Sequence, residues 1–329
     1  MKEKLSINDI AKLANVSKST VSRYLNQGYV KNETRVKIAN VIKENNYEPN
    51  RFARLKAKSS HIIGVIAPCL DSSVTSQVLM SIDATLREND YISLIINTNH
   101  DNEEELRNME NLSRMNVDGI IINATQVSEK HDEIAKRLEI PVVFVAQTCN
   151  EGVSIINEDY KAGMYVGEYA ANCGHKSILC VSVDEQDEAI GVQRKQGIID
   201  GLTSKGVDKI DFVLGDFSLQ YSYERIKAVL DKDHYDMIIC STTKQLLAAY
   251  KCVREKALKI PDDISIIGFG GLETSEMLVP KATTVQFNPP MTGVISANAM
   301  LAMLSGEEVQ QIQRVPFTFN EGESVKRRN

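Results

Sequence analysis

The chain has 329 residues, of which 43% are hydrophobic and 25% are charged, and its formal net charge is −6. This length exceeds one ordinary hydrophobic core, so we expect two or three domains. No apolar run approaches the roughly 20 residues that span a bilayer, and no secretory signal is visible, which predicts a cytoplasmic protein without membrane contact. The six cysteines form no CxxC pair and no metal-binding spacing with histidine, so we expect reduced core thiols and no metal site.

Charge is distributed unevenly along the chain. Residues 1–60 hold 13 Lys and Arg against 5 Asp and Glu, whereas the remainder holds 25 against 39. A basic N-terminal part on an acidic remainder is expected when only that part meets a phosphate backbone. The imbalance therefore favours double-stranded DNA as a partner of the N-terminal part.

Residues 6–26 predict two short helices joined by a tight turn. Ser6 lies three residues before Asp9, which is the spacing of a capping box. Asn15 tolerates the left-handed backbone that such a turn needs, and Ser17 caps the second helix. The outer side of that helix carries Lys18, Ser19, Ser22 and Arg23. Such a face fits the major groove of B-DNA, about 12 Å wide, and an amphipathic hairpin with a solvated face is the alternative.

A third helix over residues 32–45 completes a predicted DNA-binding domain over residues 1–49, and Pro49 forbids its continuation. Residues 50–60 form a short basic hinge in which Asn50 can cap a helix. The hinge mixes apolar and basic side chains, so it is either a solvated linker or a segment that becomes helical on DNA. In the second case an apolar side chain would enter a minor-groove step.

From residue 61 onward, near-continuous apolar strands alternate with helices. Strands are predicted over residues 62–67, 91–96, 119–123, 142–146, 177–182, 212–214, 237–241 and 264–269. The pattern predicts an α/β fold of parallel, doubly wound sheets in two similar halves with a cleft between them.

In open α/β sheets, ligands bind beyond the carboxyl ends of the strands. Those ends predict a set of cleft residues: Asp71, Ser72, Asn123, Thr125, Gln147, Thr148, Asp184, Arg194, Thr242, Thr243, Gly270 and Gly271. Hydroxyl and amide groups dominate this set, which suits a sugar or another polyol better than an apolar ligand.

Catalytic motifs are missing from the sequence. There is no P-loop, no GxSxG and no HExxH, and the five histidines are scattered. His175 follows Gly174 in a predicted helix-to-strand turn, where a structural role is expected. We therefore expect no enzyme activity and no cofactor. A sugar-binding transport receptor is a further alternative, against which the basic N-terminal part argues.

The combination resembles the lactose-repressor and galactose-repressor (LacI/GalR) family of bacterial transcription regulators over essentially the whole chain. The resemblance is carried by IAKLA at residues 10–14, VSKSTVSR at 16–23, YEPN at 47–50, EDYKAG at 158–163, GH at 174–175, RKQG at 194–197, IPDDI at 260–264 and PKATT at 280–284. It implies a helix-turn-helix head and a two-lobed core of the periplasmic-binding-protein kind. The lobes would comprise residues 61–157 with 287–316, and residues 158–286 with 317–329.

The resemblance also implies roles for individual residues. Lys18, Ser19 and Arg23 would read base edges. The DNA backbone and minor groove would be contacted by Ser6, Ser17, Thr20, Ser22, Asn50 and Leu55. Arg194 would hold the effector, and from the strand ends we expect it to be joined there by Asp71, Ser72, Asn123, Gln147, Thr243 and Gly271.

The expected function is an allosteric repressor, acting as a homodimer on a pseudo-palindromic operator and controlled by a sugar or sugar phosphate. Within the family, the sequence is most similar to repressors of sucrose operons in Gram-positive bacteria. The alternative is a global catabolite regulator of the same family that senses a phosphorylated carrier protein.

Three departures from the family pattern matter. Leu55 follows Arg54 directly, one residue early, which turns a helix by about 100° and moves Leu55 away from the minor groove unless the hinge rotates or starts later. Gly270 and Gly271 stand where many sugar-responsive relatives carry Asp. Residues 242–243, both Thr, replace an Asn-Asp pair, and the loss of acidic groups favours an anionic effector.

Overall fold

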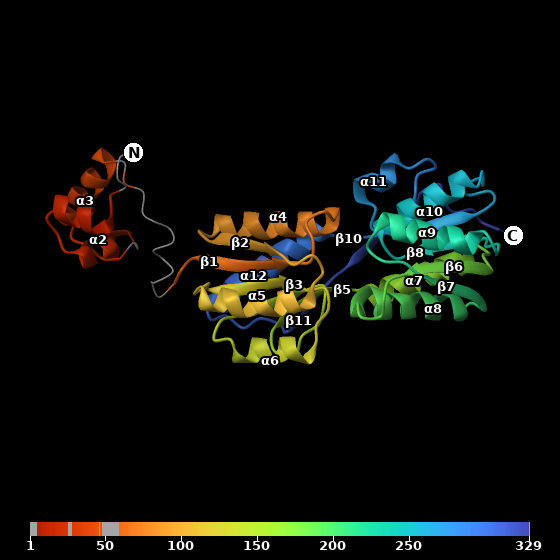
Figure 1. The fold of residues 1–329 in the computed structure, drawn as a ribbon, viewed down its shortest axis with the longest axis horizontal. Helices are drawn as coiled ribbons and strands as arrows, with labels where there is room; N and C mark the ends of the chain where they lie inside the picture. The colour runs from red at the N-terminus through yellow and green to blue at the C-terminus, as the bar shows by residue number, and fades with distance from the viewer. Residues whose placement is uncertain (1–4, 26–27, 46, 48–58, 329) are drawn as a thin grey trace. The chain divides into compact units, whose positions relative to one another are not determined.

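A computed structural model describes residues 5–25, 28–45, 47 and 59–328. The chain divides into two compact units, Met1–Ser60 and His61–Asn329. Figure 1 labels most of the helices and strands. Asn50 and Leu55 lie outside the described residues.

The described part of the small unit contains three helices: α1 (Ile7–Leu13), α2 (Lys18–Leu25) and α3 (Asn32–Glu44). These confirm the predicted helix-turn-helix and third helix. Ser6 and Asp9 form the predicted capping box. Asn15 has φ 50°, so the turn uses the left-handed backbone expected of Asn. Val21, Ile10 and Ile38 are fully buried together and hold the three helices in one small core.

The first sheet of the large unit contains six parallel strands in the order β11-β5-β4-β3-β1-β2. Their bounds are β1 (Ile62–Ala67), β2 (Ile92–Asn97), β3 (Gly119–Asn123), β4 (Val142–Val145), β5 (Val153–Asn157) and β11 (Ile312–Val315). The sheet packs with α4 (Ser73–Glu88), α5 (Asn102–Arg114), α6 (Glu129–Arg137) and α12 (Pro289–Leu304). Apolar residues of α4 and α12 form one core cluster with the strands.

The second sheet has the order β12-β10-β9-β8-β6-β7. Its strands are β6 (Ser177–Ser182), β7 (Lys209–Leu214), β8 (Met237–Cys240), β9 (Ser265–Phe269), β10 (Thr283–Phe287) and β12 (Phe317–Asn320). Its helices are α7 (Asp159–Asn172), α8 (Lys195–Thr203), α9 (Leu219–Leu230), α10 (Thr243–Glu255) and α11 (Leu272–Met277). Separate core clusters lie on the two faces of this sheet.

The chain passes between the two sheets three times, after β5, after β10 and after β11. The predicted two-lobed α/β core is therefore confirmed. β12 is an exception to the predicted parallel sheets, because it runs antiparallel to β10 as it enters the second sheet from the last crossing. A π-helix, η2 (Glu188–Arg194), precedes α8, which continues it.

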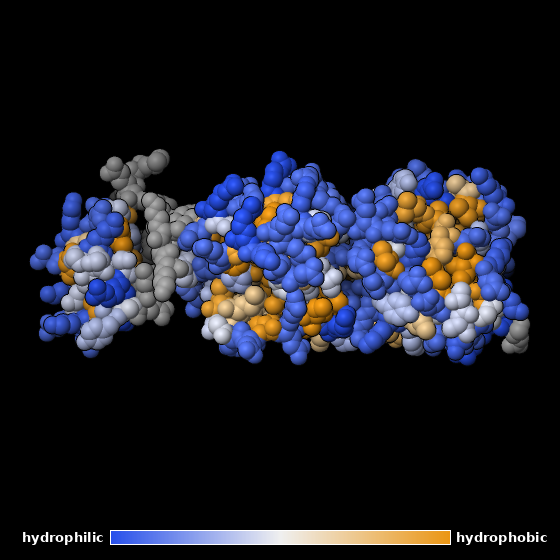
Figure 2. Space-filling model, turned by 90° about the horizontal axis from the view of Figure 1, so that it is seen from below, coloured by the Kyte–Doolittle hydropathy of each residue, from blue (hydrophilic) through white to orange (hydrophobic). Residues whose placement is uncertain are grey.

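The cysteines are free thiols, and five of the six are buried, as predicted. Figure 2 shows one face of the molecule, where hydrophilic side chains cover most of the large unit and hydrophobic ones gather in separate patches. Over the part of the chain that the structure describes, no helix is both long and apolar enough to cross a membrane.

Candidate functional site

The helix α2 places its predicted DNA-reading side chains on one open face. Lys18, Ser19 and Arg23 are exposed, whereas Val21 on the opposite side is buried in the core of the small unit. Because Val21 packs one side of α2 into the core, the opposite side of the helix faces solvent and presents two cationic side chains and a hydroxyl. This is the arrangement that a recognition helix needs to reach base edges in a major groove.

Hydroxyl groups cluster where α2 begins. Ser17 Oγ lies 2.8 Å from Ser19 Oγ and 2.7 Å from Thr20 Oγ1, and it accepts a hydrogen bond from the Thr20 amide at 3.1 Å. Ser17 therefore caps the helix as predicted. Side-chain hydroxyls beside helix N-terminal amides are common partners of phosphate oxygens. Ser6 is also exposed, but its hydroxyl is engaged with Asp9.

Gly28 is a contributor to this surface that the sequence did not indicate. Its amide donates to the Arg23 carbonyl at 2.8 Å. A Cβ at Gly28 would lie 2.6 Å from Arg23 Cγ, so any side chain there would displace the arginine. In the sequence, Gly28 is marked only as a glycine that follows the second helix, as glycines at helix ends commonly do.

Arg194 is the most buried charged member of the predicted cleft set. It donates from Nε to Asp159 Oδ1 at 2.9 Å and from Nη2 to the same oxygen, and Nη1 donates to the Ser241 carbonyl. Its guanidinium carbon lies 4.5 Å from the ring centre of Phe269 and 5.3 Å from that of Phe287. Burial raises the pKa of Asp159, and the contact with Arg194 opposes that rise. The guanidinium thus joins η2, the start of α7 and the end of β8.

Three contacts tie the two lobes together across the cleft. Lys244 Nζ of α10 lies 2.7 Å from Asp71 Oδ2, in the loop between β1 and α4. Gln147 Nε2 donates to Asp187 Oδ1 at 3.2 Å, from the end of β4 to the start of η2. The rings of His100 and Phe217 stack with centroids 5.4 Å apart. Asp187, Lys244, His100 and Phe217 are absent from the predicted set, because no local pattern marks a contact between distant loops.

Other residues of the predicted cleft set also lie at strand ends, where they cap helices or hold turns. Ser72 caps α4, and Asn123 ends β3. Thr243 Oγ1 accepts a hydrogen bond from the Gly271 amide at 2.8 Å. Gly270 and Gly271 have φ values of 81° and 92°, so this turn requires the left-handed region and disfavours an Asp. Hydroxyl groups of α10, rather than carboxylates, therefore line this part of the cleft.

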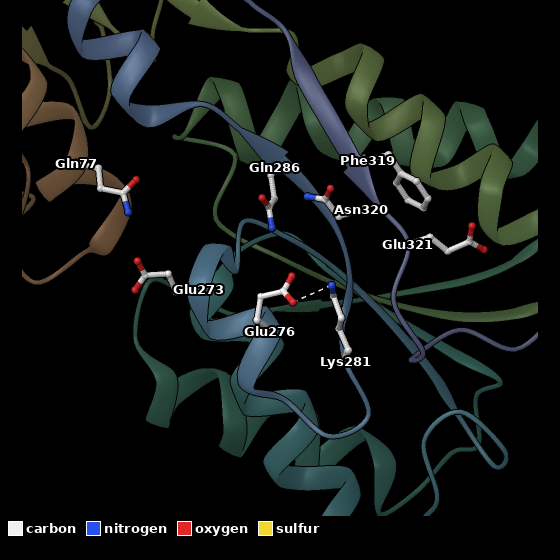
Figure 3. Close-up of a pocket in the computed structure, with 8 residues that line it drawn as sticks. All are labelled: Gln77, Glu273, Glu276, Lys281, Gln286, Phe319, Asn320 and Glu321. Atoms are coloured by element: carbon white, nitrogen blue, oxygen red, sulfur yellow. Dashed lines mark ion pairs between the residues drawn. The ribbon is translucent and has the colours of Figure 1, made fainter.

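A hollow with lining residues from both lobes was not predicted from the sequence. Its volume is about 640 Å³, and it is lined by Gln77 of α4 and by Glu273, Glu276, Lys281, Gln286, Phe319, Asn320 and Glu321 of the second lobe. Figure 3 shows the ion pair between Glu276 and Lys281, whose charged atoms lie 2.8 Å apart. The pair leaves an excess of carboxylates in this hollow.

Within the described ranges, no group of three or more His, Cys, Asp or Glu side chains is arranged to hold a metal ion. His175 is fully buried and its Nε2 lies 3.0 Å from the Lys326 carbonyl, which confirms the structural role predicted for it.

Two family models match the chain. Residues 6–50 match the model described as bacterial regulatory proteins, lacI family. Residues 60–322 match the model described as periplasmic binding proteins and sugar binding domain of LacI family.

Individual relatives span nearly the whole chain. A sucrose operon repressor of Staphylococcus xylosus is 33% identical over 93% of this chain and 96% of its own length. Catabolite control protein A of Priestia megaterium is 27% identical over 98% of this chain and 99% of its own. A crystal structure of the Lac repressor dimer bound to operator and an anti-inducer has a TM-score of 0.88 at 24% identity, covering 98% of this chain and all of that one. At that identity the likeness establishes the fold.

Proposed function

Since this chain belongs to the LacI family of bacterial regulatory proteins, we propose that it is a DNA-binding transcriptional repressor of a carbohydrate operon, with sucrose utilisation as the first candidate. A sugar or sugar phosphate in the cleft would control it allosterically. The observation that carries the proposal is the open face of α2, where Lys18, Ser19 and Arg23 stand opposite the buried Val21. The 33% identity to a sucrose operon repressor supports the choice of operon.

The proposed mechanism couples the cleft to DNA through the lobes. A ligand that binds one arrangement of the lobes more tightly shifts the equilibrium toward it, and its coupling to DNA is limited by that difference in affinity. Two copies of the small unit would then gain or lose the spacing needed for half-sites about 34–36 Å apart. We assign no chemical reaction to the cleft. The relatives of this chain described above are named as a repressor and a control protein.

We also propose that the chain acts as a homodimer. Met277 and Val279 expose 82% and 86% of their surface, although both are large apolar residues. Such neighbouring exposed residues mark association surfaces on otherwise polar proteins. A two-fold symmetric dimer would match a pseudo-palindromic operator.

Binding of the full chain to labelled duplexes tests the proposal. One duplex is the DNA upstream of the protein's own gene and the other is a random duplex of equal length. We expect tighter binding to the upstream duplex by about a thousandfold or more, as is typical for specific sites. Addition of sucrose, fructose or their phosphates should change that affinity. Equal affinity for both duplexes would overturn the proposal.

The catabolite-regulator alternative rests on the likeness to catabolite control protein A. It predicts that sugars leave operator affinity unchanged while a phosphorylated carrier protein raises it. The same titration, with that carrier in place of the sugars, separates the two functions.

A further inference from the structure

Lys244 is partly exposed, whereas Arg194, the cation of the predicted cleft set, is buried. Lys244 lies in the first turn of α10, and its side chain is 35% exposed. Its partner Asp71 belongs to the other lobe and is 71% exposed. An exposed ion pair of this kind contributes about 0–1 kcal/mol and is readily exchanged. Lys244 can therefore leave Asp71 for another anion.

Arg194 is buried, and Asp159 of the same lobe already balances its charge. Its Nε, Nη1 and Nη2 atoms all donate to Asp159 or to the Ser241 carbonyl, and aromatic rings lie against the guanidinium. Removing it from Asp159 would leave a buried carboxylate without its counter-charge, which is costly. An anionic group of a ligand would therefore meet Lys244 more easily than Arg194.

The surroundings of Lys244 suit a negative charge. The positive end of the α10 dipole lies here, with Thr242 as its N-cap. The neighbouring hydroxyl of Thr243 faces the Gly271 amide instead of a carboxylate. Asp71 itself is an anion held at this place, and its hydrogen bond with Lys244 lowers the pKa of its carboxyl. The structure thus contains one carboxylate bound where a ligand anion would bind.

We propose that Lys244 is the receptor for an anionic group of the effector, with Asp71 as an internal competitor for the same ammonium. This rests on the proposed function and narrows its effector class to phosphorylated sugars. When the phosphate takes Lys244, Asp71 is released, and one of the three contacts that tie the lobes is broken. Lys244 would therefore both bind the effector and transmit its binding to the contact between the lobes.

Substitutions of Lys244 and Asp71 should change the affinity for a phosphorylated sugar in opposite directions. Calorimetric titrations of the full chain would compare sucrose 6-phosphate with sucrose, and glucose 6-phosphate with glucose. We expect the chain to bind at least one phosphorylated sugar more tightly than its free counterpart. Lys244→Gln should weaken binding of that phosphorylated sugar by about tenfold, with a smaller change for the free sugar. Asp71→Asn should tighten it by up to about fivefold because it removes the competitor.

Lys251→Gln is the matched control, because Lys251 lies on the same helix and pairs with the exposed Glu255. It should bind both ligands like the unmodified chain. If Lys244→Gln and Asp71→Asn shift phosphorylated-sugar affinity in the same direction, the pair is only a tie between lobes and the inference is wrong. It is also wrong if the unmodified chain binds no phosphorylated sugar, or binds it no better than the free sugar. Operator affinity measured without sugar reports separately on the proposed function.

Discussion

His131 Nε2 lies 3.0 Å from Glu105 Oε1, and both side chains are almost completely buried in the first lobe. The Ser128 amide donates to His131 Nδ1 at 3.1 Å. Because an amide can only donate, Nδ1 is unprotonated, and the proton is on Nε2 and is donated to Glu105. Glu105 Oε2 also accepts the Thr125 amide at 3.3 Å. The pair therefore fixes the loop that follows β3 at the cleft.

Glu105→Ala should lower the free energy of unfolding by about 1–3 kcal/mol or more, because it leaves the His131 ring and the Thr125 amide without their acceptor. Urea denaturation followed by circular dichroism measures the change. Glu103→Ala is the control, because Glu103 lies on the same helix as Glu105, α5. Its carboxylate pairs with the exposed Lys130 of α6 at 3.2 Å. Its loss should stay within about 0.5 kcal/mol. Equal losses for both variants would contradict the assigned role of Glu105.

At the buried pair of Arg194 and Asp159, removing one charge should lower the free energy of unfolding more than removing both. Asp159→Asn leaves the guanidinium buried without a counter-charge, which should cost about 3–5 kcal/mol of unfolding free energy. Removing both charges in Asp159→Leu with Arg194→Met should cost less than the single change. Glu255→Gln, which breaks an exposed pair with Lys251, serves as the control. A double variant less stable than Asp159→Asn would show that the pair itself stabilises the lobe.

Arg23→Ala should weaken specific DNA binding by about 1–3 kcal/mol and relax the preference at one base position. The reason is that a lost base-edge contact leaves the wrong bases less disfavoured. Anisotropy titrations with the operator and with single-base variants measure both effects. Lys43→Ala, an exposed change near the end of α3, is the control. If Arg23→Ala leaves the ratio of specific to random binding unchanged, Arg23 reads no base.

The capping box of α1 should make its stability depend on pH. Hydrogen bonds from Ser6 lower the pKa of Asp9 below its ordinary value of 3.8. A lowered pKa in the folded state stabilises α1 above that value, and the gain is lost as pH falls through the lowered pKa. Ser6→Ala should therefore reduce the protection of α1 amides against hydrogen exchange near neutral pH. The difference should shrink as the pH falls below 3.8, and a difference that grows with acid would refute this origin.

Val279→Arg should convert the proposed dimer to a monomer, because a buried unpaired charge at an interface costs several kcal/mol. Sedimentation velocity measures the mass directly. Met115→Arg is the control, because Met115 is also exposed but lies after α5 in the first lobe. Loss of the dimer in both variants, or in neither, would place the interface elsewhere.

Local signals in the sequence determined the head and the order of the core elements. The spacing of Ser6 and Asp9, the Asn15 turn and the charged face of α2 all act within a few residues, so the chain alone specifies them. Alternation of apolar strands with helices likewise predicted the doubly wound sheets and therefore the edge where the cleft lies. That alternation does not predict the elements after residue 269, because the crossings between lobes interrupt it there.

Only the tertiary structure decided which charges meet. Asp159 and Arg194 are 35 positions apart, and Asp71 and Lys244 are 173 positions apart. A residue pattern specifies which side of an element is buried, but it contains no information on which distant side chain will lie opposite. The second lobe buries Arg194 beside Asp159, whereas Lys244 keeps 35% of its side chain exposed and can exchange its partner.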